Sequence, residues 1–161
     1  MIELLLAVSI FACVIAISVN LISVHHTKAV QSAECLSTGL TQIESALKLF
    51  SAAKGALPSS SCTMPAPVNS SCLSNLVPDW LKVPPGAGSC LEGLQQSFYY
   101  YSKNGETYLC VKANTPSQSI LDVFSEVQKK QPDGKVFINA TCGATSNNTA
   151  NGKCLTWWIV R

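Results

Sequence analysis

The chain begins with a long apolar stretch, Met1 to Val24, that reads MIELLLAVSIFACVIAISVNLISV. Glu3 is the only charged side chain in the first 27 residues. Because about 20 apolar residues in a helix cover the hydrocarbon core of a bilayer, Leu4 to Val24 predicts a membrane-spanning helix. The leading residues are acidic rather than basic and no small-residue cleavage site follows the run. We therefore expect it to be retained rather than removed as a secretory signal.

The position of Glu3 predicts self-association. A carboxylate at the head of an apolar helix is costly unless a positive group pairs with it. The α-amino group of Met1 in the same chain is too close along the helix to be reached comfortably, whereas the amino terminus of a neighbouring copy can approach Glu3 directly. We therefore predict that Met1 and Glu3 form the assembly site of a homo-oligomer in which many such helices pack side by side.

The helical pattern continues beyond the apolar run. Apolar residues recur at alternating steps of three and four, which is typical of a helix with one buried face. They are Ala29, Ala33, Leu36, Leu40, Ile43, Leu47 and Phe50. Gly55 and Pro58 supply a stop, so we predict one helix from Ile2 to about Ala53, with its stripe packed in a core.

The part after this helix has room for one globular domain. The segment from Leu57 to Ser89 is rich in proline and serine and predicts mostly loop. Two runs rich in aromatic and β-branched residues, Ser97 to Lys103 and Glu106 to Ala113, are joined by Asn104-Gly105 and predict a hairpin. A short helix and two strands are then expected, at Ser119 to Lys130, Lys135 to Asn139 and Cys154 to Val160.

The predicted organisation has three parts: an apolar helix, 1–27, as membrane anchor or filament core; its amphipathic continuation, 28–54; and a globular head, 55–161. The fold class is α+β, with a long amino-terminal helix packed against a small antiparallel sheet and with disulfide-stapled loops. Trp157 and Trp158 are expected on opposite faces of the last strand. The tyrosines of the hairpin are interpreted as packing residues rather than as a ligand site.

The composition disfavours several classes of function. Only 12% of residues are charged and the formal net charge is +2, so the chain lacks the field that attracts nucleic acid. No nucleophile beside a base, paired carboxylates or phosphate loop stands out, and we predict no enzyme and no cofactor. His25 and His26 lack a third ligand, so we interpret them as polar residues at the membrane boundary rather than as a metal site.

The first eight residues, Met1 to Val8, resemble the amino terminus of type IV pilins and their pseudopilin relatives, whose precursors carry an Ile-Glu-Leu core just after the peptidase cut. The order of the remaining elements is also similar to theirs. The resemblance implies a type IV pilin fold whose carboxy-terminal loop is closed by a disulfide. Ala12 and Asn20 stand where relatives often carry a helix-loosening glycine and proline. The expectation of a continuous helix therefore comes from the residues of this chain, with Asn20 and Ser23 as its weakest place.

Eight cysteines, six of them after residue 55, indicate an oxidising compartment, and the absence of a Cys-x-x-Cys pair disfavours zinc. Cys13 is expected to be a free thiol in the apolar helix. Cys35 is either free or bonded to the loop region. The disulfide candidates are Cys62, Cys72, Cys90, Cys110, Cys142 and Cys154. Many connectivities are open to six cysteines; we favour Cys62 with Cys72, Cys90 with Cys110 and, matching the loop of the resembled family, Cys142 with Cys154.

The sequence thus favours a structural subunit, a major pilin, of a type IV pilus-like extracellular filament. Before assembly the subunit would be a single-pass protein of the inner membrane. The resemblance implies the pilus assembly machinery and a prepilin peptidase as partners. Two alternatives stay open: a minor pilin or a secretion or competence pseudopilin, and, from another class, a monomeric membrane-anchored binding module. Glu3 disfavours the last, because a plain tether has no use for a carboxylate there.

Overall fold

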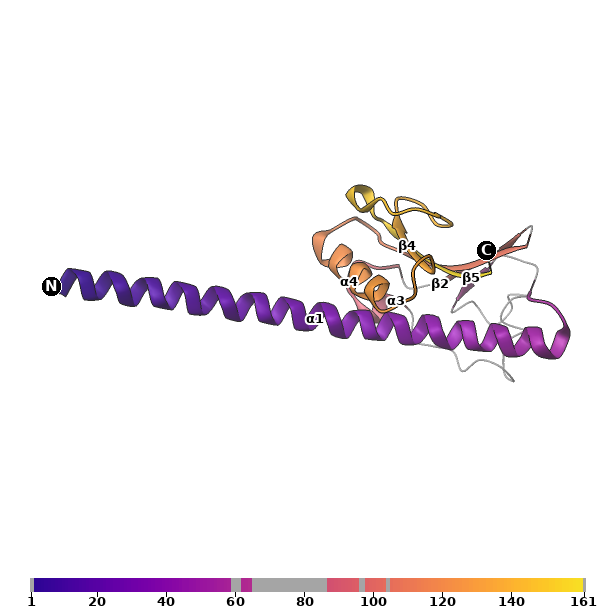
Figure 1. The fold of residues 1–161 in the computed structure, drawn as a ribbon, viewed down its shortest axis with the longest axis horizontal. Coiled ribbons are helices and arrows are strands. Elements are labelled where there is room, and N and C mark those ends of the chain that lie inside the picture. The colour runs from indigo at the N-terminus through magenta and orange to yellow at the C-terminus, as the bar shows by residue number, and fades with distance from the viewer. Residues whose placement is uncertain (1, 59–61, 65–86, 96–97, 104, 161) are drawn as a thin grey trace.

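The computed structural model describes the backbone of residues 2–58, 62–64, 87–95, 98–103 and 105–160; within these ranges the side chains of residues 2–23, 25, 62–64, 103 and 151 are not described. A long helix carries a head built on one antiparallel sheet (Figure 1). The predicted α+β class is therefore confirmed.

Helix α1 (Ile2–Lys54) is one uninterrupted helix of 53 residues, as predicted. At 1.5 Å per residue it is on the order of 80 Å long. It ends where Gly55 adopts a φ of 78° and donates its amide to the carbonyl of Ser51 at 2.8 Å, a left-handed conformation that glycine adopts without steric cost. The first half of α1 projects beyond the head, and the second half lies against it (Figure 1).

The sheet has five antiparallel strands in the order β1-β2-β3-β5-β4. The strands are β1 (Cys62–Met64), β2 (Phe98–Lys103), β3 (Glu106–Lys112), β4 (Val136–Asn139) and β5 (Cys154–Val160). The predicted hairpin is β2–β3, and Gly105 in its turn has a φ of 84°. Strand β1 was expected to be loop; it is a three-residue edge strand that pairs with β2.

The described part of the head also contains the helices α3 (Ala87–Cys90) and α4 (Gln118–Lys129) and the 3₁₀ turn η1 (Thr149–Asn151). Helix α4 is the predicted short helix, shifted by one residue. It begins at Ser117, whose hydroxyl accepts a hydrogen bond from the Ile120 amide at 3.4 Å. This is the capping role that serine commonly takes.

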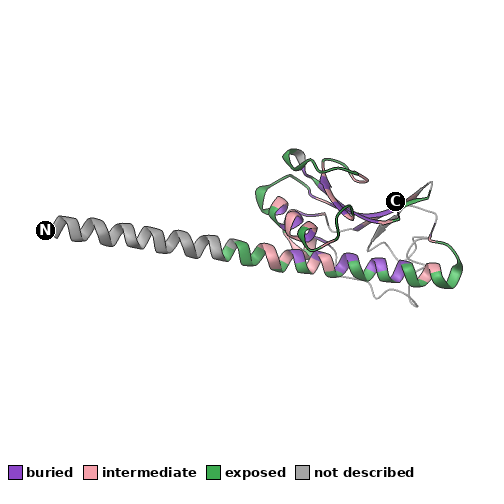
Figure 2. Cartoon of the chain, in the orientation of Figure 1, coloured by how far each residue is buried: buried purple, intermediate pink, exposed green. Residues whose placement is uncertain are grey.

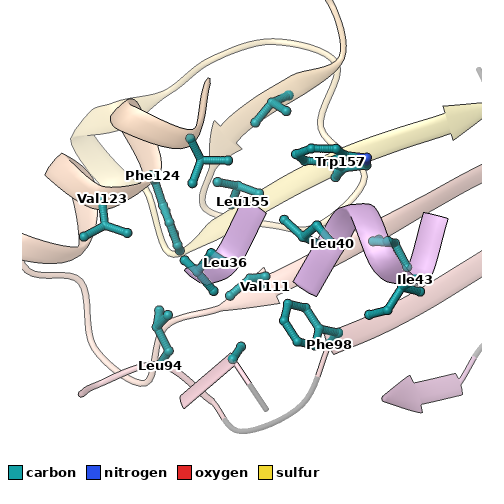
Figure 3. Packing of buried hydrophobic residues seen from close by; sticks show 14 of the residues in the cluster. Leu36, Leu40, Ile43, Leu94, Phe98, Val111, Val123, Phe124, Leu155 and Trp157 are labelled. Carbon is teal, nitrogen blue, oxygen red and sulfur yellow. The ribbon is translucent and has the colours of Figure 1, made fainter. Parts of the chain in front are cut away.

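The main core lies between α1 and one face of the sheet, with α4 beside α1. Figure 2 shows buried residues recurring along the second half of α1, and Figure 3 shows Leu36, Leu40 and Ile43 meeting side chains of the sheet and of α4. Because neighbouring strand residues point to opposite faces, Trp157 joins this core while Trp158 joins a second cluster on the other face. The prediction for the two tryptophans is confirmed.

The second face of the sheet is covered by the loop between β4 and β5, residues 140–153, which we call the covering loop. In this loop Gly143 donates its amide to the Thr156 hydroxyl at 3.0 Å, and the carbonyl of Ala144 accepts a hydrogen bond from the Trp158 indole at 3.0 Å. Farther along, the side chain of Asn147 accepts from the Ile138 amide at 2.9 Å. The loop therefore covers both the outer face and the free edge of β4, an edge that is otherwise open to pairing with another chain.

In the part of the chain that the structure describes, no helix is long and apolar enough to cross a membrane. The predicted span, Leu4 to Val24, lies almost wholly outside the residues whose side chains are described. The membrane anchor therefore stays a prediction.

The close packing of α1 on β2 yields a test at Gly39. A Cβ added there would lie 2.9 Å from Cζ of Phe98, whose side chain is fully buried. We expect Gly39→Val to lower the free energy of unfolding by about 1–3 kcal/mol, the usual cost of overpacking a core. The measurement is a urea titration of the full chain in detergent.

The matched control is Thr38→Val, one residue earlier on the exposed side of the same helix. Valine and threonine have similar helix propensities, so this variant should unfold at the wild-type urea concentration. Equal stability of Gly39→Val and Thr38→Val would contradict the described contact between α1 and β2.

Candidate functional site

The predicted assembly site lies outside the residues that the structure describes in full. Met1 is not described, and Glu3 is described only as a backbone position in the first turn of α1. Val24, His26, Thr27 and Lys28 are exposed, and Ala33 is the first buried residue among the described side chains of α1. Glu3 therefore lies on the part of α1 that extends beyond the contact between this helix and the head.

A disulfide links α1 to the head. Cys35 of α1 is bonded to Cys90 at the end of α3, with the two Cα atoms 5.5 Å apart. This settles the role left open for Cys35, and the predicted pairing of Cys90 with Cys110 is wrong. The spacing in sequence could not show it, because the contact between α1 and α3 depends on the tertiary core in which Ala87 is buried. The bond closes a loop of 55 residues.

A buried carboxylate makes a second link between α1 and the head. Glu44 is 6% exposed and accepts hydrogen bonds from Lys48 at 2.7 Å, from Lys135 at 2.9 Å and from the Trp157 indole at 2.6 Å. Lys135 also lies over the Trp157 ring, 4.7 Å from its centroid, where an ammonium is attracted to the π face. We call Glu44, Lys135 and Trp157 the ionic anchor; it joins α1 to β5 and to the residue before β4.

The environment of Glu44 keeps it ionised. Burial by itself raises the pKa of the carboxyl group, but hydrogen bonds from Lys48, Lys135 and Trp157 and the charge of Lys135 outweigh it, so the pKa lies below its ordinary value. Glu44 was not among the residues predicted to have a role. One feature of the sequence indicates its burial: Glu44 follows Leu40 by four residues, so it lies on the same face of the helix, at the border of the apolar stripe.

The outer face of the sheet brings three cysteines together. Cys110 of β3 is bonded to Cys142 of the covering loop, and Cys154 at the start of β5 is a buried free thiol. The predicted pairing of Cys142 with Cys154 is therefore wrong in this structure. The register of the sheet places Cys110 opposite Thr156, and the loop is held at Thr156 by the amide of Gly143, so Cys142 reaches β3. We call Cys110, Cys142 and Cys154 the three-cysteine cluster.

Two other cysteine predictions are not addressed. The pairing of Cys62 with Cys72 and the free state of Cys13 lie outside the described side chains. Of the histidines, His26 is exposed and the side chain of His25 is not described. Among the described residues, one group of three potential metal ligands lies close together, and it is the three-cysteine cluster, in which two sulfurs form a disulfide.

Aromatic side chains pack beside the three-cysteine cluster. Tyr108 stacks on Tyr101 with ring centroids 4.9 Å apart, and it meets Trp158 at the same distance in a tilted arrangement. Tyr108 and Trp158 are 9% and 5% exposed. These rings fill the space between sheet and loop, in line with their interpretation as packing residues.

Comparison of the chain with models of protein families, with curated proteins and with solved structures finds no match. The functional interpretation therefore rests on the chain's own residues. In the described part of the chain, apolar packing, a disulfide and the ionic anchor join the projecting helix α1 to the head.

The ionic anchor predicts a pH-dependent stability. We expect Glu44→Gln to lower the free energy of unfolding at pH 7 by on the order of 2 kcal/mol, because hydrogen bonds to a charged group are lost. Since the pKa of Glu44 is depressed in the folded state, this stabilisation is present above the ordinary carboxyl pKa and is lost as the pH falls through the folded value. Urea titrations of both chains from pH 7 to pH 3 should therefore converge in acid.

Glu34→Gln is the matched control, because Glu34 is also on α1 and also pairs with a lysine of the head, Lys130, at 3.2 Å. That pair is exposed, and such pairs contribute at most about 1 kcal/mol. A Glu44→Gln deficit that stays constant across the pH range, or one no larger than that of Glu34→Gln, would count against the ionic anchor.

Proposed function

We propose that this chain is the structural subunit, the major pilin, of a type IV pilus-like extracellular filament. One observation carries the proposal. Helix α1 is unbroken over 53 residues, its first half projects beyond the head (Figure 1), and Glu3 is the only charged side chain among residues 1–27 of the chain.

The apolar half of α1 needs a non-aqueous environment. Fully burying a large aliphatic side chain is worth about 1.5–3 kcal/mol, and the run from Leu4 to Val24 is interrupted only by three serines and Asn20. Lipid meets this need before assembly, which places the subunit in the inner membrane as a single-pass protein. A bundle of identical helices meets it after assembly, with the heads on the outside of the filament.

The contacts between α1 and the head support a role in a polymer. The apolar stripe, the Cys35–Cys90 bond and the ionic anchor hold the second half of α1 against the head. A head attached in this way follows the position of its helix. Ordered packing of the helices then imposes the same order on the heads, which a flexible tether does not do.

The assembly step exchanges lipid contacts for helix–helix contacts and pairs Glu3 with the amino-terminal ammonium of a neighbouring subunit. The pilus assembly machinery and a prepilin peptidase are proposed partners on the strength of the resemblance of Met1 to Val8. A minor pilin or pseudopilin shares this chemistry and differs in abundance. Its share of the material sheared from the cell surface distinguishes it from a major subunit.

The pairing mechanism predicts the behaviour of Glu3→Ala. Removing one partner of a buried ion pair costs about 3–5 kcal/mol, which raises the concentration needed for polymerisation by roughly two to four orders of magnitude. We expect the variant to retain the Cys35–Cys90 bond but to form few or no filaments on removal of detergent. Sedimentation and negative-stain electron microscopy measure the outcome.

Glu34→Ala removes an exposed carboxylate from the same helix and should polymerise as the wild type does. Normal filaments from Glu3→Ala would refute the pairing mechanism. A wild-type chain that stays monomeric at all concentrations would instead favour the membrane-anchored binding module.

A further inference from the structure

The three-cysteine cluster holds one more sulfur than its disulfide uses. The Sγ atoms of Cys110, Cys142 and Cys154 all lie within 4.8 Å of one another, and Cys154 is a free thiol that is 5% exposed. A thiol that lies next to a disulfide is positioned for exchange, because its thiolate attacks a disulfide sulfur directly. The cluster therefore contains every reactant of an exchange reaction.

The backbone around the cluster allows Cys142 to reach either neighbouring cysteine. Cys142 belongs to the covering loop, whose next two residues are held over β5 by the bonds from Gly143 to Thr156 and from Trp158 to Ala144. Both bonds are independent of the disulfide. They keep Cys142 above the ends of β3 and β5 whichever sulfur it is bonded to.

Cys110 and Cys154 are less suited to bond with each other. In the register of the sheet, Cys110 lies opposite Thr156 and Cys154 lies opposite Lys112, so the two cysteines are diagonal neighbours. Cα atoms on such a diagonal are about 7–8 Å apart, beyond the usual reach of a disulfide without backbone movement. Attack at Cys142 is therefore the favoured exchange.

We infer that the head exists in two disulfide forms that interconvert through attack of Cys154 on Sγ of Cys142. The Cys154 thiol gives up its proton to solvent, and its thiolate forms a new bond to Cys142. The bond between Cys142 and Cys110 breaks, its electron pair stays on Cys110, and Cys110 takes up a proton. One disulfide and one thiol are present before and after, so the step needs no oxidant or reductant.

The local chemistry makes the exchange slow at neutral pH. Burial raises the pKa of the Cys154 thiol, and the positive charges of Lys112 and Lys153 oppose this shift only in part. The thiolate is the nucleophile, so its scarcity limits the rate. Below the pKa, the rate should rise about tenfold for each unit of pH.

The consequence is a change in how the outer layer is stapled. In the described form the covering loop, which connects β4 to β5, is bonded to β3. This bond joins cysteines that are 32 residues apart in sequence. In the exchanged form the loop is closed on the start of β5 and Cys110 is a buried thiol in β3. The cluster is thus a switch between a loop stapled to β3 and a loop stapled to its own following strand.

The test is a disulfide map of the full chain in detergent, incubated at pH 7, pH 8 and pH 9 without added thiols, quenched in acid and alkylated with a maleimide. Trypsin then separates the three cysteines, because lysines flank them at positions 103, 112, 135 and 153. We expect a peptide that links Cys142 to Cys154 to accumulate at pH 9, with an equal yield of alkylated Cys110. Its rate should be independent of protein concentration.

Two comparisons make the outcome decisive. The level of a peptide linking Cys90 to Cys154 measures non-specific scrambling, and the Cys142–Cys154 peptide should exceed it at least about tenfold. In Cys154→Ser, Cys110 should stay bonded to Cys142 and unalkylated at every pH. A Cys142–Cys154 yield no higher than the scrambling level, or release of Cys110 in Cys154→Ser, would overturn the inference.

Discussion

One stripe of α1 is buried against one face of the sheet, and this burial joins the helix to the head. Leu36, Leu40 and Ile43 of α1 are fully buried in the core that α1 forms with the sheet and α4 (Figure 3). A head of about 100 residues buries a modest core for its surface, so it needs this helix as part of its interior. The same helix extends beyond the head along its first half (Figure 1).

Three kinds of interaction hold the helix to the head, and they respond to different conditions. Apolar packing is insensitive to pH and redox state near neutrality. The Cys35–Cys90 bond depends on an oxidising environment, and the Glu44 carboxylate depends on remaining ionised. Their combination gives a subunit whose head stays attached to its helix when any one of them is weakened. Such redundancy suits the proposed role in an extracellular filament.

Local patterns in the sequence were sufficient for most of the fold. The three-and-four spacing from Ala29 to Phe50 and the stop at Gly55 predicted α1 to within a residue, and Asn104-Gly105 predicted the β2–β3 hairpin. These features depend on residues close in sequence, whose physics is periodicity and turn geometry. Strand β1 was missed because a three-residue edge strand leaves no periodic signal in a proline-rich segment.

The links between distant segments were not predictable in the same way. Cys142 bonds to Cys110 because the covering loop folds back over the register of β3 and β5, and that register is a property of the assembled sheet. Glu44 looked like an ordinary polar residue of the helix until Lys135 and Trp157 were placed beside it. Pairings of this kind need the tertiary structure, whereas Glu3 stands out in the sequence because it is the only charged residue in a long apolar run.

The central claim is that Glu3 is neutralised by the amino terminus of an adjoining subunit when the helices bundle. A high-resolution reconstruction of the assembled state by electron cryo-microscopy measures this directly. The account predicts the Glu3 carboxylate within hydrogen-bonding distance of a neighbouring chain's terminal nitrogen at every subunit. A carboxylate that faces lipid or water, remote from any positive group, would contradict it.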